Sequence, residues 1–216
     1  GTCTTWSTPS LQSRRRLLVA EMLNPATLRA LEAFPQLLEG HFAAIPEGFA
    51  HWSPASWEGV PSEAFTAIEQ ICHVRDIEVE GYHVRFARTL AETHPTLASI
   101  DSEAIAVARS YASADPAKVF AAFRQARATT LGLIAGFTAQ QLDRTAEFEG
   151  YGALSLRSLV HYLCSHDQPH LAGLQWLLGK IEAARIEGRP GASPAAYRLL
   201  LSLALPPGPR QPPQLR

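Results

Sequence analysis

The chain has 216 residues, of which 46% are hydrophobic and 18% are charged, a balance typical of a globular protein rather than of a disordered or fibrous one. Its 19 Lys and Arg residues are offset by 20 Asp and Glu residues, so no basic surplus favours phosphate binding and we expect no nucleic-acid partner. No apolar run approaches the about 20 residues of a membrane span, and three cysteines without disulfide-framework spacing are typical of a reducing compartment. We therefore predict a cytoplasmic protein with no membrane partner.

The two ends of the chain differ in composition from its middle. Residues 1–22 mix Thr and Ser with three consecutive arginines. We expect this segment to be an N-terminal extension outside the core, although an extension packed on the domain is an equally open interpretation. Residues 188–216 are rich in proline, and we expect a partly disordered C-terminal extension there. The domain itself is predicted to span residues 23–187.

The first of four expected helices begins at a clear signal. Asn24 can cap this helix, and Pro25 takes the first helical position, where a missing N–H has no cost. Pro35 lies further along the same apolar-periodic segment and should kink the helix.

The second expected helix follows a loop that contains proline, glycine and two tryptophans. Ser62 is expected to cap this helix, which runs to about residue 90. Its apolar residues recur at helical spacing, and this stripe includes Val79 and Tyr82. We expect Val79 to be buried for that reason.

The last two helices complete the domain. Asp115 and Pro116 repeat the cap-and-proline signature ahead of the third helix. A turn is expected around residues 138–152, and Ser155 starts the fourth helix. No strand alternation competes with these helices, so the predicted fold is all-α, a four-helix bundle. The connection of residues 92–115 is long enough to cross the bundle between the second and third helices, which can then run parallel.

Two histidines lie on the apolar face of the fourth helix. His166 and His170 share the steps of three and four that place a row of leucines on one face of a helix advancing about 100° per residue. A polar ring carried into a core must be hydrogen-bonded or coordinated. Rings at i and i+4 project side by side, as two ligands of one metal ion would. His73, on a polar stripe of the second helix, is the best third ligand.

The histidines also allow interpretations other than a metal site. A buried histidine is often a satisfied core residue, so structural histidines are the alternative. The string HDxxH at residues 166–170 differs from the zinc-protease HExxH, because Asp replaces the general-base Glu and no third ligand follows at a suitable spacing. Three histidines from two helices would leave coordination positions for water or substrate, which is the open arrangement of a catalytic site.

At these residues the chain resembles a known family. The segment HVRDIE that starts at His73, after a loop carrying WSP at residues 52–54, is similar to the "WSP…HLxDxE" region of DinB-like proteins. The segment YGALSLRSLVHYLCSHDQPH is similar to their "G…TL…HDxxH" fourth helix, and the likeness covers residues 24–183. It implies a four-helix bundle with a crossover between the second and third helices. It also implies a divalent metal ion, often zinc or nickel, held by histidines that match His73, His166 and His170.

The chain departs from the family pattern in two places. The loop carrying Trp57, Gly59 and Pro61 lengthens the spacing between WSP and the first histidine, which indicates an insertion or a displaced start of the second helix. Pro169 sits inside the HDxxH repeat, where it removes one backbone hydrogen bond and should bend the helix between its two ligands. Such a bend could weaken the site or could be what aims His170.

Four charged residues near the histidines are further candidates. We expect Asp76 to orient His73, with a ligand role or a solvated position as the alternatives. Arg85 and Arg127 could bind an acidic substrate, with solvated arginines on helix flanks as the alternative. Asp167 points about 100° away from His166 around the helix, so we expect it at the surface or in helix pairing rather than in catalysis.

The predicted function is that of a divalent-metal-dependent enzyme acting on a small-molecule substrate. Zinc or nickel would lower the pKa of a coordinated water or of a low-molecular-weight thiol cofactor. That chemistry supports metal-assisted hydrolysis or thiol S-transfer, and the resemblance favours S-transfer because characterised relatives include thiol S-transferases. The alternative is a non-enzymatic, stress-related metal-binding or scaffold bundle, which a coordination sphere filled entirely by protein would indicate. Dimers are common among such bundles, and we expect a homodimer.

Overall fold

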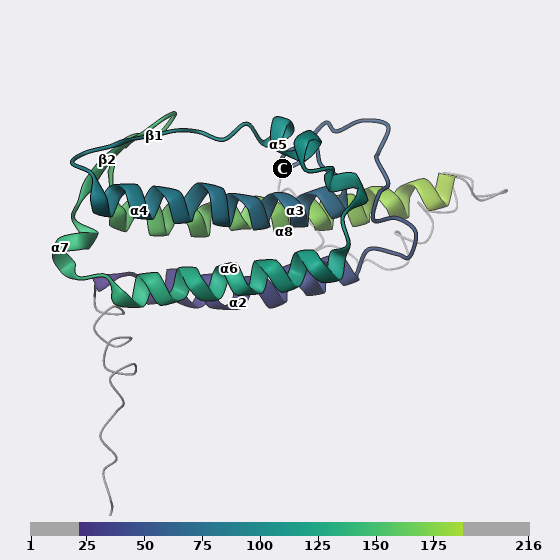
Figure 1. The fold of residues 1–216 in the computed structure, drawn as a ribbon. Helices are drawn as coiled ribbons and strands as arrows, with labels where there is room; N and C mark the ends of the chain where they lie inside the picture. Colours follow the sequence, from purple (N-terminus) through teal and green to yellow (C-terminus); the bar gives the residue numbers. More distant parts are fainter. Residues whose placement is uncertain (1–21, 188–216) are drawn as a thin grey trace, which may run out of the picture. The chain divides into compact units, whose positions relative to one another are not determined.

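The computed structural model of the protein describes residues 22–187. The predicted extensions at residues 1–22 and 188–216 lie outside this range, apart from Met22, and so stay predictions. The chain divides into two compact units, Gly1–Leu178 and Gly179–Arg216. Four long helical segments form a bundle within the first unit, and the last of them continues beyond Leu178 (Figure 1), which confirms the predicted all-α, four-helix architecture.

The first helix begins as its sequence signal predicts. α2 spans Pro25–Ala43, and the Oδ1 atom of Asn24 accepts a hydrogen bond from the backbone N–H of Ala26 at 2.8 Å. The helix continues past Pro35, and it buries Leu31, Phe34 and Leu38.

The second helical segment starts later than predicted. It consists of α3 (Ala67–Asp76), η1 (Ile77–His83) and α4 (Val84–Ala91), which follow one another without a break. Its N-cap is Thr66 rather than Ser62, because Thr66 and Glu69 form a reciprocal capping box. The Oε2 atom of Glu69 accepts a hydrogen bond from the Thr66 backbone N–H at 2.9 Å. This is the displaced start that the long loop indicated as one of two alternatives.

The middle of this segment is a π-helix, η1, seven residues long. A π turn closes its hydrogen bonds over more residues than an α turn, so it changes which side chains face the core. Val79, predicted to be buried, is 42% exposed, while the neighbouring Glu78 is only 1% exposed. The prediction for Val79 was wrong because it assumed an uninterrupted α-helix.

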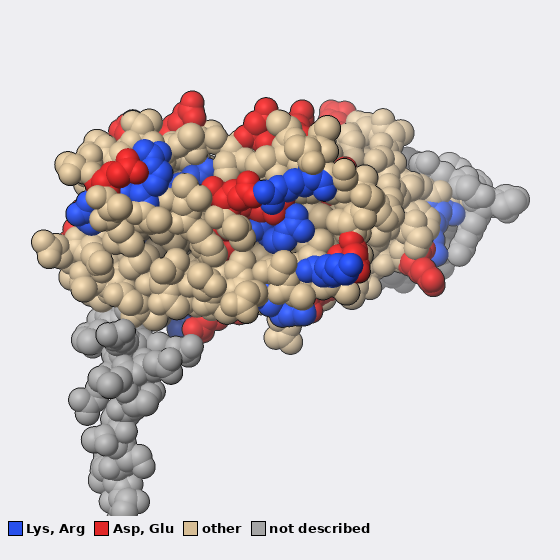
Figure 2. All heavy atoms as spheres, viewed as in Figure 1, with Lys and Arg blue, Asp and Glu red and all other residues tan. Residues whose placement is uncertain are grey.

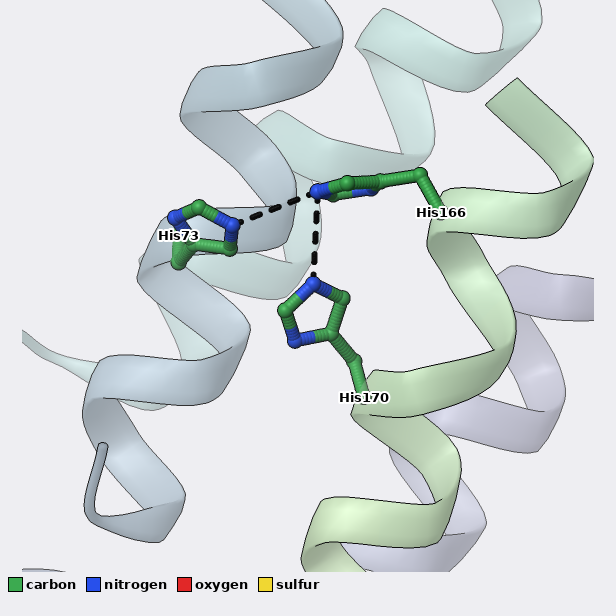
Figure 3. A group of neighbouring side chains, drawn as sticks. All are labelled: His73, His166 and His170. Carbon is green, nitrogen blue, oxygen red and sulfur yellow. Dashed lines mark hydrogen bonds between the residues drawn. The ribbon is translucent and has the colours of Figure 1, made fainter. Parts of the chain in front are cut away.

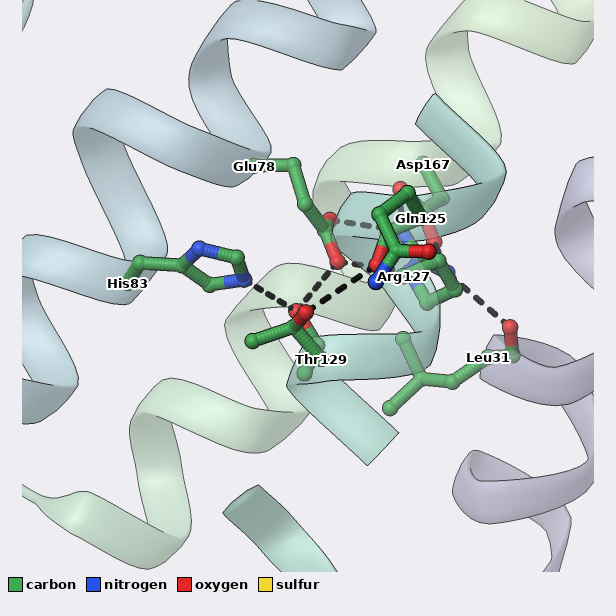
Figure 4. A network of polar contacts seen from close by, with 8 residues as sticks. Leu31, Glu78, His83, Gln125, Arg127, Thr129 and Asp167 are labelled. Atoms are coloured by element: carbon green, nitrogen blue, oxygen red, sulfur yellow. Dashed lines mark hydrogen bonds and ion pairs between the residues drawn. The ribbon is translucent and has the colours of Figure 1, made fainter. Parts of the chain in front are cut away.

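The buried Glu78 belongs to an ion-pair network around one arginine (Figure 4). Arg127 lies on α6 (Pro116–Gly136) and donates hydrogen bonds to both carboxylate oxygens of Glu78, at 2.8 and 2.9 Å. It also donates to both carboxylate oxygens of Asp167, at 2.9 and 3.0 Å, and to the Leu31 carbonyl oxygen at 3.0 Å. All five N–H donors of the guanidinium are thereby used. Asp167 therefore has the helix-pairing position that was one of its two expected roles.

A second branch of this network reaches the helix flank. The Thr130 hydroxyl donates to Glu78 Oε1 at 2.5 Å and lies 2.8 Å from Nε2 of His83. Burial raises the pKa of Asp167 to about 7, although Arg127 opposes this shift. The network thus joins α2, η1, α6 and the last helix through polar groups that are almost fully removed from solvent.

The predicted crossover is present between the second and third helical segments. Residues 92–115 contain β1 (Thr96–Leu97), α5 (Ser102–Ala108) and η2 (Tyr111–Ser113). After this connection the side chain of Asp115 caps α6 by accepting a hydrogen bond from the Ala117 backbone N–H at 2.9 Å. Figure 1 shows that α3 and α6 run in the same direction, as the long connection allows.

A small sheet occupies the region where a simple turn was predicted. After α7 (Ala139–Leu142), β2 (Thr145–Phe148) pairs antiparallel with β3 (Gly152–Ser155) and parallel with β1. Only four residues alternate in β2, with the second and fourth buried, which is too short a pattern to predict a strand. The hairpin between β2 and β3 turns through Gly150, at φ +82°, so the left-handed backbone there favours glycine.

The last helix, α8 (Leu156–Glu187), carries the two predicted ligands. Ser155 stands at its start as predicted, and its hydroxyl accepts a hydrogen bond from the Ser158 backbone N–H at 3.2 Å. The helix continues through Pro169. Within residues 22–187, no helix combines the length and the apolar character needed to cross a membrane.

The charged side chains on one face of the molecule are mixed. Figure 2 shows Lys and Arg side chains next to Asp and Glu side chains on this face, rather than gathered in a basic patch. Arg109, for example, pairs with both Asp76 and Glu80. This view agrees with the absence of a basic surplus in the composition, while the lack of a nucleic-acid partner stays a prediction.

The network around Arg127 predicts a large and selective effect on stability. Arg127→Met keeps an unbranched apolar stem but leaves Glu78 and Asp167 buried without a counter-charge, so we expect a loss of about 3–5 kcal/mol in the free energy of unfolding. Urea unfolding measures this loss. Arg124→Met, one turn earlier, removes an exposed pair with Glu39 and should cost less than about 1 kcal/mol. Equal losses for the two variants would contradict a structural role for the network.

Candidate metal centre

Three imidazole rings converge inside the bundle (Figure 3). The Nε2 atom of His166 lies 3.3 Å from Nε2 of His73 and 3.3 Å from Nε2 of His170. His73 comes from α3, and the other two rings come from successive turns of α8. One nitrogen from each ring lies within 4.8 Å of the nitrogens from the other two. The convergence holds although Pro169 stands between the two α8 histidines.

The spacing of the three nitrogens fits a single divalent cation. At a metal–nitrogen distance of about 2.0–2.1 Å, two ligands of a tetrahedral ion lie about 3.3–3.4 Å apart, and two neighbouring ligands of an octahedral ion lie about 2.9 Å apart. The two 3.3 Å separations centred on His166 match the tetrahedral value, while the nitrogens of His73 and His170 lie within 4.8 Å of each other. The three nitrogens therefore suit the metal site that the sequence predicts, with His166 at ligand spacing from both other rings.

A buried amide holds one of the rings in the form that binds metal. The Oε1 atom of Gln70 lies 2.6 Å from Nδ1 of His170, while its Nε2 atom donates to the Ser62 hydroxyl at 2.6 Å and to the Glu63 carbonyl oxygen at 3.1 Å. Because a carbonyl oxygen only accepts, the amide nitrogen must face Glu63 and the amide oxygen must face His170. Nδ1 of His170 therefore carries the proton, and the lone pair of its Nε2 is left for a metal ion.

Burial also keeps the three rings in their neutral form. It lowers the pKa of His166 to about 3, with further lowering by nearby positive groups, and it lowers the pKa of His170 well below its ordinary value. Burial lowers the pKa of His73 as well, against the opposing charges of Glu63 and Asp76. Neutral imidazole is the form that coordinates a metal ion, so protons compete weakly at this site near neutral pH.

A pocket of about 320 Å³ opens against the centre. Its wall includes His166 and His170, together with residues from the loop before α3, from α8 and from the β2–β3 hairpin. At the tip of that hairpin Tyr151 stacks on Phe148, with ring centroids 4.6 Å apart, and packs against Tyr162 at 4.8 Å. The small sheet that replaced the predicted turn therefore supplies the aromatic side of the pocket.

Asp76 lies in a different network from the one expected. Its carboxylate accepts hydrogen bonds from Arg75 at 2.7 and 2.8 Å and from the Tyr111 hydroxyl at 2.8 Å, and it pairs with Arg109 at 3.0 Å. Within the described residues, these partners of the Asp76 carboxylate do not include the His73 ring that Asp76 was expected to orient. Asp76 thus connects α3 with the crossover segment and acts on His73 only through its charge.

The two arginines considered for substrate binding do not line the pocket. Arg127 is 1% exposed and its donors are all used in the ion-pair network. Arg85 is 6% exposed, lies over the rings of Phe148 and Tyr82 at 4.4 and 5.2 Å, and donates to the Ala98 carbonyl oxygen at 3.2 Å. Both arginines contact other parts of the protein core rather than the pocket.

Two residues beside the histidines were missed by sequence reasoning. Gln70 lies one turn before His73, and its only sequence signal was that position on the helix. Glu63 lies in the irregular segment before α3, where no periodicity marks it. Its Oε1 atom is 3.4 Å from Nε2 of His73, and its Oε2 atom is 3.8 Å from Nε2 of His170.

Comparison with known proteins relates this arrangement to others. The sequence pattern of the DinB superfamily matches residues 30–173, a range that contains all three histidines. The structure is similar to that of YfiT from Bacillus subtilis, which is described as a probable metal-dependent hydrolase with an unusual four-helix bundle topology. The two chains share 17% sequence identity with a TM-score of 0.63, and the match covers 84% of this chain and 95% of that chain. No curated protein matches this sequence.

The position of Gln70 predicts an effect on metal affinity. Gln70→Leu keeps the bulk of the side chain but frees the His170 ring, so we expect the Zn²⁺ dissociation constant to rise about 10–100-fold. Competition with a chromophoric chelator measures it, and a thermal melt checks that the variant folds. Gln168→Leu changes an exposed amide on α8 and should leave the constant unaltered. An unchanged affinity for Gln70→Leu would show that His170 is held by other contacts.

Proposed function

The chain belongs to the DinB superfamily, and from this membership together with its three converging histidines we propose that it is a metal-dependent enzyme acting on a small molecule. The observation that carries the proposal is that His166 and His170 belong both to the nitrogen cluster and to the wall of the pocket. A molecule in the pocket can therefore reach the point where the three rings meet. This shared wall favours an enzyme over a scaffold with a structural metal ion.

The residues supply a site that is ready to bind before metal arrives. A divalent cation held there would act as a Lewis acid. Imidazole ligands suit both zinc and nickel, which we propose as the cations. The chain orients the His170 ring through Gln70 and keeps all three rings neutral by burial. His166 is the most exposed of the three rings, and it is the one that joins the other two.

We propose hydrolysis rather than thiol S-transfer as the reaction. The pocket wall carries Glu63, and among the described residues that line it there is no Lys or Arg. The described wall residues thus offer no cationic side chain to pair with the carboxylate of a low-molecular-weight thiol, whereas a water molecule needs none. The description of YfiT as a probable metal-dependent hydrolase points in the same direction. S-transfer with a low-molecular-weight thiol is the alternative that the experiment must separate.

We also propose a single functional domain, a compartment and an assembly for this protein. We propose that residues 23–187 work as one domain, that the protein is cytoplasmic, and that it forms a homodimer without nucleic-acid or membrane partners. The substrate is proposed to be small, since the pocket measures about 320 Å³.

Metal content tests the proposal directly. Wild-type protein purified without chelator should hold about one zinc or nickel ion per chain, and His166→Ala should hold much less, as measured by elemental analysis. His161→Ala is the matched control, because His161 lies on the same helix but pairs with the Thr27 hydroxyl at 2.9 Å. Equal, substoichiometric metal in wild type and His166→Ala would show that the site is wrong.

Activity then distinguishes the two reactions. We expect hydrolysis of members of an ester and amide panel, lost with chelator, restored by zinc or nickel, and absent in His166→Ala. A metal-dependent transfer of a low-molecular-weight thiol to an electrophile, without hydrolysis, would favour the alternative.

A further inference from the structure

We propose that Glu63 is a fourth ligand of this metal centre, one that a molecule entering the pocket displaces. The inference rests on the proposed metal site at His73, His166 and His170. It adds a residue of the loop before α3, where the sequence carries no metal-binding pattern.

The position of the carboxylate fits a fourth ligand. Its Oε1 atom lies 3.4 Å from Nε2 of His73, and its Oε2 atom lies 3.8 Å from Nε2 of His170. The first of these separations is close to the 3.3 Å between the histidine nitrogens, and the second is longer. Oxygen and nitrogen ligands of a tetrahedral ion at about 2.0–2.2 Å lie about 3.3–3.6 Å apart. One carboxylate oxygen thus lies at ligand spacing from His73, and a small rotation of the exposed Glu63 side chain would bring it to the fourth position.

The hydrogen bonds around the site explain why a carboxylate stands there. Nδ1 of His170 carries the proton toward Gln70, so Nε2 of His170 presents a lone pair. That lone pair lies 3.8 Å from Oε2 of Glu63, which is also an acceptor, so a cation shared between them would be bound by both. A divalent cation among three neutral imidazoles carries two positive charges, and a carboxylate ligand offsets one of them.

The Glu63 side chain is much more exposed than the side chains of His73 and His170. The Glu63 side chain is 39% exposed, whereas the side chains of His73 and His170 are 2% and 1% exposed. The backbone of Glu63 is held, because its carbonyl oxygen accepts hydrogen bonds from Gln70 at 3.1 Å and from the Phe65 backbone N–H at 2.7 Å. The carboxylate can thus swing away without opening the core and return to the same place.

The pocket supplies what would displace it. Glu63 is part of the pocket wall together with His166, His170 and Tyr151. A guest with a carboxylate or carbonyl oxygen at one end and a flat apolar part against the Tyr151 ring would fill this space and take the position of Glu63. The coordination sphere is then closed by protein at rest and open when a guest is bound, which reconciles a fourth protein ligand with catalysis.

The test uses Co²⁺ as a spectroscopic substitute for the native ion and acetate as a probe guest. Glu63→Ala and the shape-retaining Glu63→Gln should bind Co²⁺ about tenfold or more weakly than wild type, with altered visible bands. Acetate should restore wild-type-like bands in Glu63→Ala, at about tenfold or more lower concentration than it perturbs the wild-type bands. Glu58→Gln, an exposed glutamate of the same loop, should match wild type throughout.

The contrary outcomes distinguish failure of the Glu63 role from failure of the metal site. Wild-type Co²⁺ affinity and bands in both Glu63 variants, with no binding by His166→Ala, would overturn the role of Glu63 and leave the metal site standing. Weakened binding in the Glu63 variants, with wild-type bands that no acetate concentration perturbs, would make Glu63 a permanent ligand and overturn its displacement. Wild-type Co²⁺ binding by His166→Ala would overturn the metal site and the inference together.

Discussion

The hydrogen bond between Gln70 and His170 is the contact on which the site depends. One fully buried amide sets the protonated nitrogen of His170, anchors the backbone of Glu63 and binds the Ser62 hydroxyl. The helix opposite leaves room for it, since a Cβ atom at Gly173 would lie 2.5 Å from the Ser62 hydroxyl oxygen and 3.1 Å from the Gln70 amide nitrogen. Side chains from α3, α8 and the loop between α2 and α3 are thereby brought to one point.

The ion pairs of Arg127 determine how α8 faces the rest of the bundle. Asp167 adjoins His166 in the chain, and both of its carboxylate oxygens are held by the guanidinium. With Asp167 directed at α6, the helical geometry turns His166 toward α3 and His73. The π-helix η1 serves the same arrangement, because it brings Glu78 inward to share Arg127. The ion pairs of Arg127 lie outside the pocket wall, but they help to position His166, which is part of that wall.

One side of the pocket wall comes from segments outside the four long helices, and the other side comes from α8. The loop before α3 contributes Glu63, and the β2–β3 hairpin contributes Tyr151. The helices are left to hold the three rings at fixed separations. Loops positioned by a rigid frame are the usual place for groups that contact a substrate, and this division is consistent with a fixed nitrogen cluster beside a more adaptable fourth ligand.

The starts of α2 and α6 and the histidine pair could be predicted from local chemistry, since a cap, a proline at the first turn and an i, i+4 spacing all act within one or two turns. Asn24, Asp115 and the rings of His166 and His170 lie as those signals indicated. The π-helix, the hairpin and the roles of Gln70 and Glu63 required the folded chain. Each depends on a partner far away in sequence: 49 residues separate Glu78 from Arg127, and 100 separate Gln70 from His170. The periodicity of one helix does not indicate which buried side chain of another helix will contact it.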